Sequence, residues 1–170
     1  MVKDKRKKDA PTATETPLNP SSTTDNCNTL YRKSQAKREQ RTRNFATVVY
    51  PESAPSDWID KLDQLHVAAL ISPLHDKDTN PSGEPKKPHY HVLLMFEGVK
   101  DYETQVKPIF AEIGGVGREM VNSARGYARY LCHLDNPEKA QYEPSEVRCM
   151  GGADYTDITN LPTDTRKMLA

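Results

Sequence analysis

Cysteine is scarce in this chain of 170 residues, and its three cysteines lie far apart, at Cys27, Cys132 and Cys149. None of them belongs to a C-x-x-C pair. The sequence therefore indicates neither a disulfide framework nor a cysteine-based zinc site. Because thiols in a reducing compartment stay unpaired, this spacing favours reduced cysteines in a cytosol.

Long apolar runs are also missing. No stretch approaches the roughly 20 apolar residues that a membrane-spanning helix needs, and the N-terminus shows no apolar signal region. We therefore expect a cytoplasmic protein that does not bind membranes. No internal repeat indicates a solenoid.

The first 43 residues have few large apolar side chains and an uneven charge. They carry 11 Lys/Arg against 5 Asp/Glu, although the formal net charge of the whole chain is zero. A segment of this composition cannot bury enough apolar surface to offset its ordering entropy, so we predict a disordered basic extension over residues 1–43. Its charge suits attraction to a polyanion such as nucleic acid, or it serves only solubility.

Apolar patterning predicts an ordered domain over residues 44–156, followed by a short tail over residues 157–170. β-branched and aromatic runs bounded by Pro and Gly predict strands, and apolar residues three or four apart predict helices. The expected strands are 44–50, 68–73, 89–96, 117–122 and 147–150, and the expected helices are 56–65, 101–113 and 123–136.

This order of strands and helices predicts an α+β fold of the ferredoxin-like split βαβ type. We expect an antiparallel sheet with helices on one face and a metal site on the other.

Histidines are concentrated around one predicted hairpin. His89 and His91 open the strand PHYHVLLMF, and His75 ends the preceding strand. Residues i and i+2 of a strand point to the same face, so both imidazoles can approach one point. Asp78 adds a carboxylate three residues after His75. Imidazole and carboxylate ligands predict a divalent-metal site, which we favour over a chance cluster on a half-exposed face.

Two tyrosines share one face of the last predicted helix, because Tyr127 and Tyr130 are three residues apart. A tyrosine hydroxyl near a bound cation can act as a covalent nucleophile. Spacing alone favours the structural alternative, in which both rings pack against the sheet and only the hydroxyl meets water. His133 follows Tyr130 by three residues, and its position fits either orienting that hydroxyl or capping the helix.

Four segments in order resemble the plasmid rolling-circle replication initiators, the Rep proteins of the HUH endonuclease superfamily. They are YPESAPSDW, ISPLHDKD, KKPHYHVLL and YARYLCH, and the agreement extends from about Phe45 to Asp154. The resemblance implies an endonuclease domain that binds Mn²⁺ or Mg²⁺ through His75, Asp78, His89 and His91. Tyr130 matches the nucleophilic tyrosine, and Tyr127 is the second choice.

The implied reaction begins at the double-strand origin of a small circular plasmid, where one strand is nicked in a single-stranded hairpin loop. The tyrosine stays joined to the 5′ end, the freed 3′-hydroxyl primes the host replication machinery, and a later transfer closes the displaced strand, as a topoisomerase would. Energy kept in the phosphotyrosine bond removes the need for ATP, in agreement with the absence of a G-x-x-x-x-G-K-[ST] motif.

Further positions are candidates for DNA contact. Lys86 and Lys87 precede the histidine strand, and Arg125 and Arg129 flank the tyrosines; solvated lysines and surface salt bridges are the structural alternatives. Family members also carry a C-terminal oligomerisation region, and only residues 157–170 follow the predicted domain here. Formation of a homo-oligomer is therefore left open.

Three other functions remain as alternatives. A mobilisation relaxase or an HUH transposase would use the same metal and tyrosine. A non-covalent phosphoesterase would need a second His-x-Ser/Thr motif or a third alternating histidine, and neither is present. A DNA-binding module could use the metal for stability alone.

Overall fold

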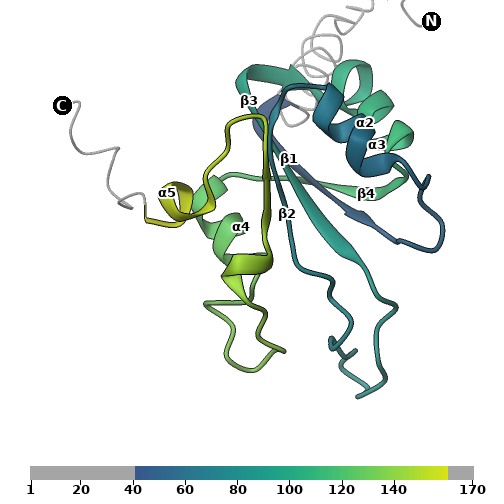
Figure 1. Ribbon diagram of the computed structural model, residues 1–170, viewed down its shortest axis with the longest axis vertical. Coiled ribbons are helices and arrows are strands. Elements are labelled where there is room, and N and C mark those ends of the chain that lie inside the picture. The colour runs from purple at the N-terminus through teal and green to yellow at the C-terminus, as the bar shows by residue number, and fades with distance from the viewer. Residues whose placement is uncertain (1–40, 161–170) are drawn as a thin grey trace, which may run out of the picture. The chain divides into compact units, whose positions relative to one another are not determined.

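The computed structural model describes residues 41–160, which form one α+β unit (Figure 1). Most of the predicted N-terminal extension and residues 161–170 of the predicted tail lie outside the described residues. In chain order the elements are β1 (Arg41–Val49), α2 (Trp58–Gln64), β2 (Ala68–Ile71), β3 (Tyr90–Asp101), the π-helical turn η1 (Tyr102–Val106), α3 (Lys107–Glu112), β4 (Gly115–Met120), α4 (Ala124–Tyr130), the 3₁₀ turn η2 (Pro144–Glu146), β5 (Arg148–Met150) and α5 (Tyr155–Asn160).

The strands form one five-stranded sheet in the order β4-β1-β3-β2-β5. Every neighbouring pair is antiparallel, and the central strand β3 pairs with both β1 and β2. Leu94 of β3, for example, lies between Phe45 and Ala69. The α+β fold with an antiparallel sheet is therefore confirmed.

Each face of the sheet carries its own apolar core. On one face α2, η1 and α3 cover the strands, and Phe45, Leu62, Leu94 and Phe110 are buried there. Figure 1 shows α4 and α5 on the other side of the sheet from α2 and α3. Alternate residues of β3 therefore face different helices. Tyr90 packs its ring on Trp58 of α2, at 5.6 Å between centroids.

The helices are distributed differently from the prediction in one respect. The sequence placed them all on the face away from the histidines, whereas α4 and α5 pack on the histidine face. The reason is a second apolar cluster, in which Tyr127, Ala128 and Leu131 are buried against Leu70 and Leu93 of the sheet. An amphipathic helix must bury its apolar side, and this face of the sheet offers apolar residues to receive it.

Two predicted helices have different limits in the structure. The helix expected over residues 101–113 opens with the turn η1 and becomes α-helical at Lys107, with Pro108 in its first turn. Proline fits there because its missing N–H needs no intrahelical partner. The helix expected over residues 123–136 already ends at Tyr130, and His133 adopts a left-handed backbone conformation, with φ of 56°. Within residues 41–160, no helix combines the length and apolarity needed to cross a bilayer.

Candidate active site

The hairpin between β2 and β3 brings the predicted histidines together. His75 and His89 pair across the hairpin through two backbone hydrogen bonds, His75 N–H to the His89 carbonyl at 2.9 Å and His89 N–H to the His75 carbonyl at 3.3 Å. His91 lies on the same face two residues later. One ring nitrogen from each of the three side chains falls within 4.8 Å of the other two.

Asp78 lies beside this histidine group and is itself buried. Its Oδ2 is 3.4 Å from Nδ1 of His75, and its Oδ1 accepts a hydrogen bond of 3.1 Å from the hydroxyl of Tyr142. The Tyr142 ring also stacks on the His75 ring, with 4.2 Å between centroids and 2° between planes. Tyr142 therefore holds both the carboxylate and the imidazole in place, a role that the sequence did not reveal.

The hydrogen bonds of the imidazoles leave nitrogens available for a cation. Nδ1–H of His89 donates to the Lys87 carbonyl at 2.8 Å, and Nε2–H of His75 donates to the Leu131 carbonyl at 2.9 Å. A backbone bond of this kind fixes the tautomer and orients the other nitrogen as a ligand. Nδ1 of His75 is buried without a hydrogen-bond partner among the described residues. An orphaned buried nitrogen facing a carboxylate oxygen fits a divalent cation.

Burial keeps two of these rings neutral, which is the form that binds metal. Desolvation lowers the pKa of His91 from 6.5 to about 3, and the neighbouring His75 and His89 add to the shift. Desolvation also lowers the pKa of His75, although the hydrogen bond to the Leu131 carbonyl opposes it. The histidine clusters can therefore hold a metal.

His133 is a fourth buried histidine at this site. Its ring centroid is 4.7 Å from that of His75, and His75, Asp78 and His133 form a second group of closely spaced ligand atoms. Nδ1–H of His133 donates to the Ala140 carbonyl at 2.8 Å. From the sequence, His133 was expected only as a partner of Tyr130 or as a helix cap. The sequence held one signal for a place of His133 at this site: it is one of five histidines in the chain, and it lies three residues after Tyr130.

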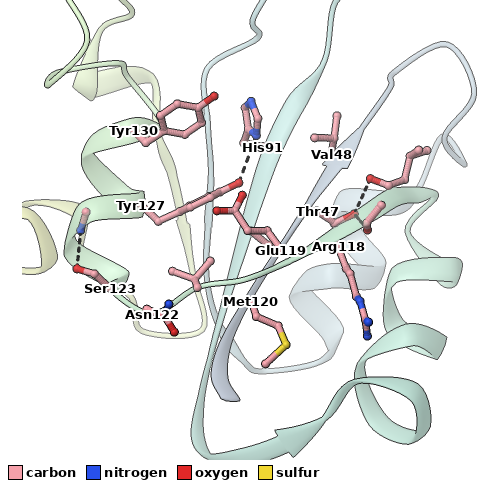
Figure 2. Close-up of a pocket in the computed structure, with 15 residues that line it drawn as sticks. Thr47, Val48, His91, Arg118, Glu119, Met120, Asn122, Ser123, Tyr127 and Tyr130 are labelled. Atoms are coloured by element: carbon pink, nitrogen blue, oxygen red, sulfur yellow. Dashed lines mark hydrogen bonds between the residues drawn. The ribbon is translucent and has the colours of Figure 1, made fainter. Parts of the chain in front are cut away.

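Both candidate tyrosines extend from α4 toward His91 (Figure 2). The hydroxyl of Tyr127 is buried and lies 3.3 Å from Nδ1 of His91, and burial strongly raises the pKa of this phenol. The Tyr130 ring stands edge-on to the His91 ring at 5.4 Å and is partly exposed. Its hydroxyl accepts a hydrogen bond of 3.3 Å from Nζ of Lys139. The two phenols therefore have different environments despite their shared helix face.

Two clefts meet at the site. The larger, of about 690 Å³, lies between β1, β4 and α4, and Figure 2 shows Glu119 and Asn122 in its wall. The smaller, of about 440 Å³, is lined by residues that include Asp78, Lys86 and His89. Val48, His91 and Tyr130 belong to both linings. An extended ligand can therefore pass from one cleft to the other beside the histidines.

The four basic residues predicted to contact DNA differ in whether they line a cleft and in the partners that their side chains already have. Lys86 and Lys87 both line the smaller cleft. Lys87 forms an ion pair with Glu52 and lies over the Tyr50 ring. Arg129 is bound by both carboxylate oxygens of Asp135, at 2.6 and 2.7 Å, and Nε of Arg125 donates to the Thr159 carbonyl at 3.0 Å.

The family described as plasmid replication protein, origin binding domain, matches residues 37–156. The chain belongs to this family. The matched range contains every residue of the histidine group, Asp78, both tyrosines and Lys139. The resemblance of its four segments to plasmid replication proteins is therefore confirmed.

Three curated relatives agree with this assignment. The chain is 38% identical over 140 residues to a replication protein from Staphylococcus aureus, covering 82% of this chain and 70% of the relative. It is 42% identical over 128 residues to the replication protein RepB from Lactiplantibacillus plantarum, covering 75% of this chain and 57% of the relative. Identity to RepB from Streptococcus agalactiae is 31%, covering 77% of this chain and 67% of the relative.

Proposed function

We propose that this domain binds a plasmid origin and is a metal-dependent endonuclease and strand transferase that starts rolling-circle replication there. The proposal is supported above all by one arrangement: a partly exposed tyrosine whose ring contacts a buried, neutral histidine of a possible metal cluster. The family match supplies the substrate class, plasmid origin DNA.

In this proposal His75, Asp78, His89 and His91 hold Mn²⁺ or Mg²⁺. When bound, such an ion polarises a phosphate oxygen and stabilises the negative charge that develops around phosphorus. The chain's own contribution is to orient the ligands. Backbone carbonyls fix the rings of His75 and His89, and Tyr142 holds Asp78.

Tyr130 is the proposed nucleophile. Its phenolic oxygen attacks phosphorus and the bond from phosphorus to the 3′ oxygen breaks, so one phosphoester bond replaces another and no ATP is consumed. The phenol proton passes to water, and the released 3′ oxygen takes a proton from water. The free 3′-hydroxyl can then prime the host replication machinery. Attack by a 3′-hydroxyl on the phosphotyrosine reverses the step and closes a circle.

The DNA path in this proposal uses the two clefts. A single strand from the hairpin loop of the origin would cross Val48, His91 and Tyr130, which line both clefts. Lys86 is placed to meet a backbone phosphate in the smaller cleft. The Glu119 carboxylate in the larger cleft repels phosphate and can accept hydrogen bonds from base amino groups, so the cleft beside Glu119 suits a base better than the backbone.

The test is a nicking assay on a supercoiled plasmid that carries the native origin region, with Mn²⁺ present. The wild type should give nicked or relaxed DNA with protein joined to a 5′ end. Tyr130→Phe should lose both products at any Mn²⁺ concentration, while Tyr127→Phe, the comparison variant on the same helix face, should keep the adduct at saturating Mn²⁺. An adduct that survives in Tyr130→Phe and disappears in Tyr127→Phe would move the nucleophile by one helical turn.

Two further measurements separate the alternatives. His91→Ala should abolish nicking while the far-UV circular dichroism spectrum stays unchanged, and retained cleavage would remove the metal from the mechanism. Removal of divalent ions that unfolds the wild type, with no cleavage under any condition, would indicate a metal-stabilised DNA-binding module. Sequencing the attached DNA distinguishes a replication origin from the target of a mobilisation relaxase or a transposase.

A further inference from the structure

We propose that Lys139, in the loop after α4, is a further catalytic residue of the strand transfer. It would bind the reacting oxygen of Tyr130, orient it toward phosphorus and stabilise negative charge on it when the phosphotyrosine bond breaks. This inference rests on the proposed function, and it adds a residue that the predicted metal and tyrosine set did not contain.

Two contacts hold the ammonium group of Lys139 on the Tyr130 side chain. Its Nζ donates a hydrogen bond of 3.3 Å to the hydroxyl and lies 4.6 Å from the ring centroid. An ammonium over an aromatic face is attracted by the ring quadrupole. Together the two contacts restrict rotation of the phenol, so its oxygen has a defined direction beside His91.

The loop that carries Lys139 is closed at its base by one side-chain and one backbone hydrogen bond. Nδ1–H of the buried His133 donates to the Ala140 carbonyl at 2.8 Å, and the N–H of Tyr142 donates to the Cys132 carbonyl at 3.4 Å. Within the loop, Lys139 N–H donates to the Asn136 carbonyl at 3.0 Å. Because the base is tied to buried residues, the position of Lys139 is set by the fold.

The left-handed backbone of His133 is part of this construction. Its φ of 56° is unfavourable for a non-glycine residue and persists only where surrounding contacts hold it. Here it follows the end of α4, three residues after Tyr130, at the start of the loop that carries Lys139. This loop brings Lys139 to the hydroxyl of the residue nine positions earlier.

The charge of Lys139 matters most when the phenolic oxygen is the leaving group. In rejoining, a 3′-hydroxyl attacks phosphorus, the bond from phosphorus to the tyrosine oxygen breaks, and the electron pair stays on that oxygen. An N–H donor already at that atom stabilises the phenoxide until it takes a proton from water. Lys139 itself is neither consumed nor changed. Fixed donors of this kind contribute most where charge develops in a site that excludes water.

The experiment compares Lys139→Met, Lys139→Arg and Lys100→Met in the full chain. Methionine keeps an apolar stem and removes the donor and the charge, whereas arginine retains both. Lys100 is the matched control, because its Nζ also lies over an aromatic ring, that of Phe96 at 5.7 Å, at the opposite end of β3 from His91. The substrate is a single-stranded oligonucleotide that contains the nick site mapped on the plasmid, with Mn²⁺ at saturation.

Single-turnover rates are measured for adduct formation and for rejoining, together with the Kd of the oligonucleotide. Lys139→Met should slow both rates at saturating DNA by roughly 10- to 100-fold, as expected for loss of a charged donor at a reacting atom. The rate of rejoining should fall by at least the same factor as the rate of nicking. Lys139→Arg should recover most of both rates, and Lys100→Met should have the wild-type rates. Circular dichroism and the Tm should be unchanged in all three variants.

Other outcomes overturn the inference. A wild-type rate at saturating DNA in Lys139→Met, with only a weaker Kd, would make Lys139 a DNA contact, and failure of arginine to restore any rate would remove the charge from the explanation. Tyr130→Phe keeps the two proposals apart. If that variant still forms the adduct, both proposals fail. If it does not, and Lys139→Met reacts normally, only the role of Lys139 fails.

Discussion

The hydroxyl of Tyr127 lies 3.3 Å from Nδ1 of His91. Tyr130, one helical turn later, contacts the same imidazole with its ring but bonds its hydroxyl to Lys139. The more buried phenol thus supports a candidate ligand, and the more exposed one lines both clefts, where a substrate can reach it. This difference in partners favours Tyr130 as the nucleophile and Tyr127 as a residue that orients His91.

Tyr127→Phe should therefore weaken metal binding more than chemistry. Loss of a partner that orients a metal ligand typically reduces affinity by about 10- to 100-fold. We expect a drop within that range in Mn²⁺ affinity, measured by electron paramagnetic resonance titration, with adduct formation recovered at high Mn²⁺. An adduct that does not return at saturating Mn²⁺ would contradict this supporting role.

Asp78→Asn should remove the carboxylate while keeping the shape of the side chain. The amide can still accept the hydrogen bond from Tyr142, so the fold should persist. A neutral amide is a much weaker ligand for a hard divalent cation, and we expect at least about a 10-fold loss in Mn²⁺ affinity by calorimetry. The exposed Asp76→Asn, two residues earlier, is the control and should bind Mn²⁺ as the wild type does.

Stability of the metal-free protein should fall as the pH is lowered through about 6.5. The unfolded chain protonates His91 near its ordinary pKa of 6.5, whereas the folded protein resists protonation until about pH 3. The unfolded state therefore binds more protons across this interval, and stability decreases by up to about 1.4 kcal/mol per pH unit for each such histidine.

Urea unfolding between about pH 7 and pH 5, with a chelator present, measures this slope. His75 adds in the same direction, because burial lowers its pKa too. His91→Gln should show a shallower dependence on pH than the wild type. An unchanged slope in His91→Gln would contradict the prediction.

Lys86 and Arg129 should differ in their effect on DNA binding. Lys86 lines the smaller cleft, whereas the guanidinium of Arg129 is already held by both oxygens of Asp135. We expect Lys86→Gln to reduce the slope of log K against log salt by about 0.7, the value for one phosphate contact with a single strand. Arg129→Gln should change that slope less. Equal changes would show that the Asp135 pair opens on binding.

Gly151 and Gly152 offer a matched pair for testing the turn after β5. Both have a positive φ, of 57° and 81°, which costs an alanine about 1–2 kcal/mol. A Cβ at Gly151 would also lie 2.2 Å from the carbonyl oxygen of Val67, whereas one at Gly152 meets nothing within 4 Å. Gly151→Ala should therefore lose clearly more unfolding free energy than Gly152→Ala in urea. Equal losses would contradict the close approach of the two backbones.

Much of the fold followed from local patterning. The alternation of residues over 89–96 predicted a strand with His89 and His91 on one face. In the structure β3 begins at Tyr90, His89 pairs with His75 just before it, and both side chains lie at the site. The limits of α4 were harder to predict, because its end depends on the left-handed turn at His133. That turn is held by a bond to Ala140, seven residues along the chain, and helical spacing carries no information about it.

The sequence alone determined which residue types were available and which strand face carried the histidine pair, because side-chain direction along a strand has a fixed period of two. Only the tertiary structure decided their partners. The bond of Tyr142 to Asp78 joins residues 64 apart, and that of Tyr127 to His91 joins residues 36 apart. Such contacts depend on how α4 and the loop after it bury their apolar side chains against the sheet. The free energy of that packing is a sum over the whole core, so it cannot be predicted from the spacing of residues in one segment.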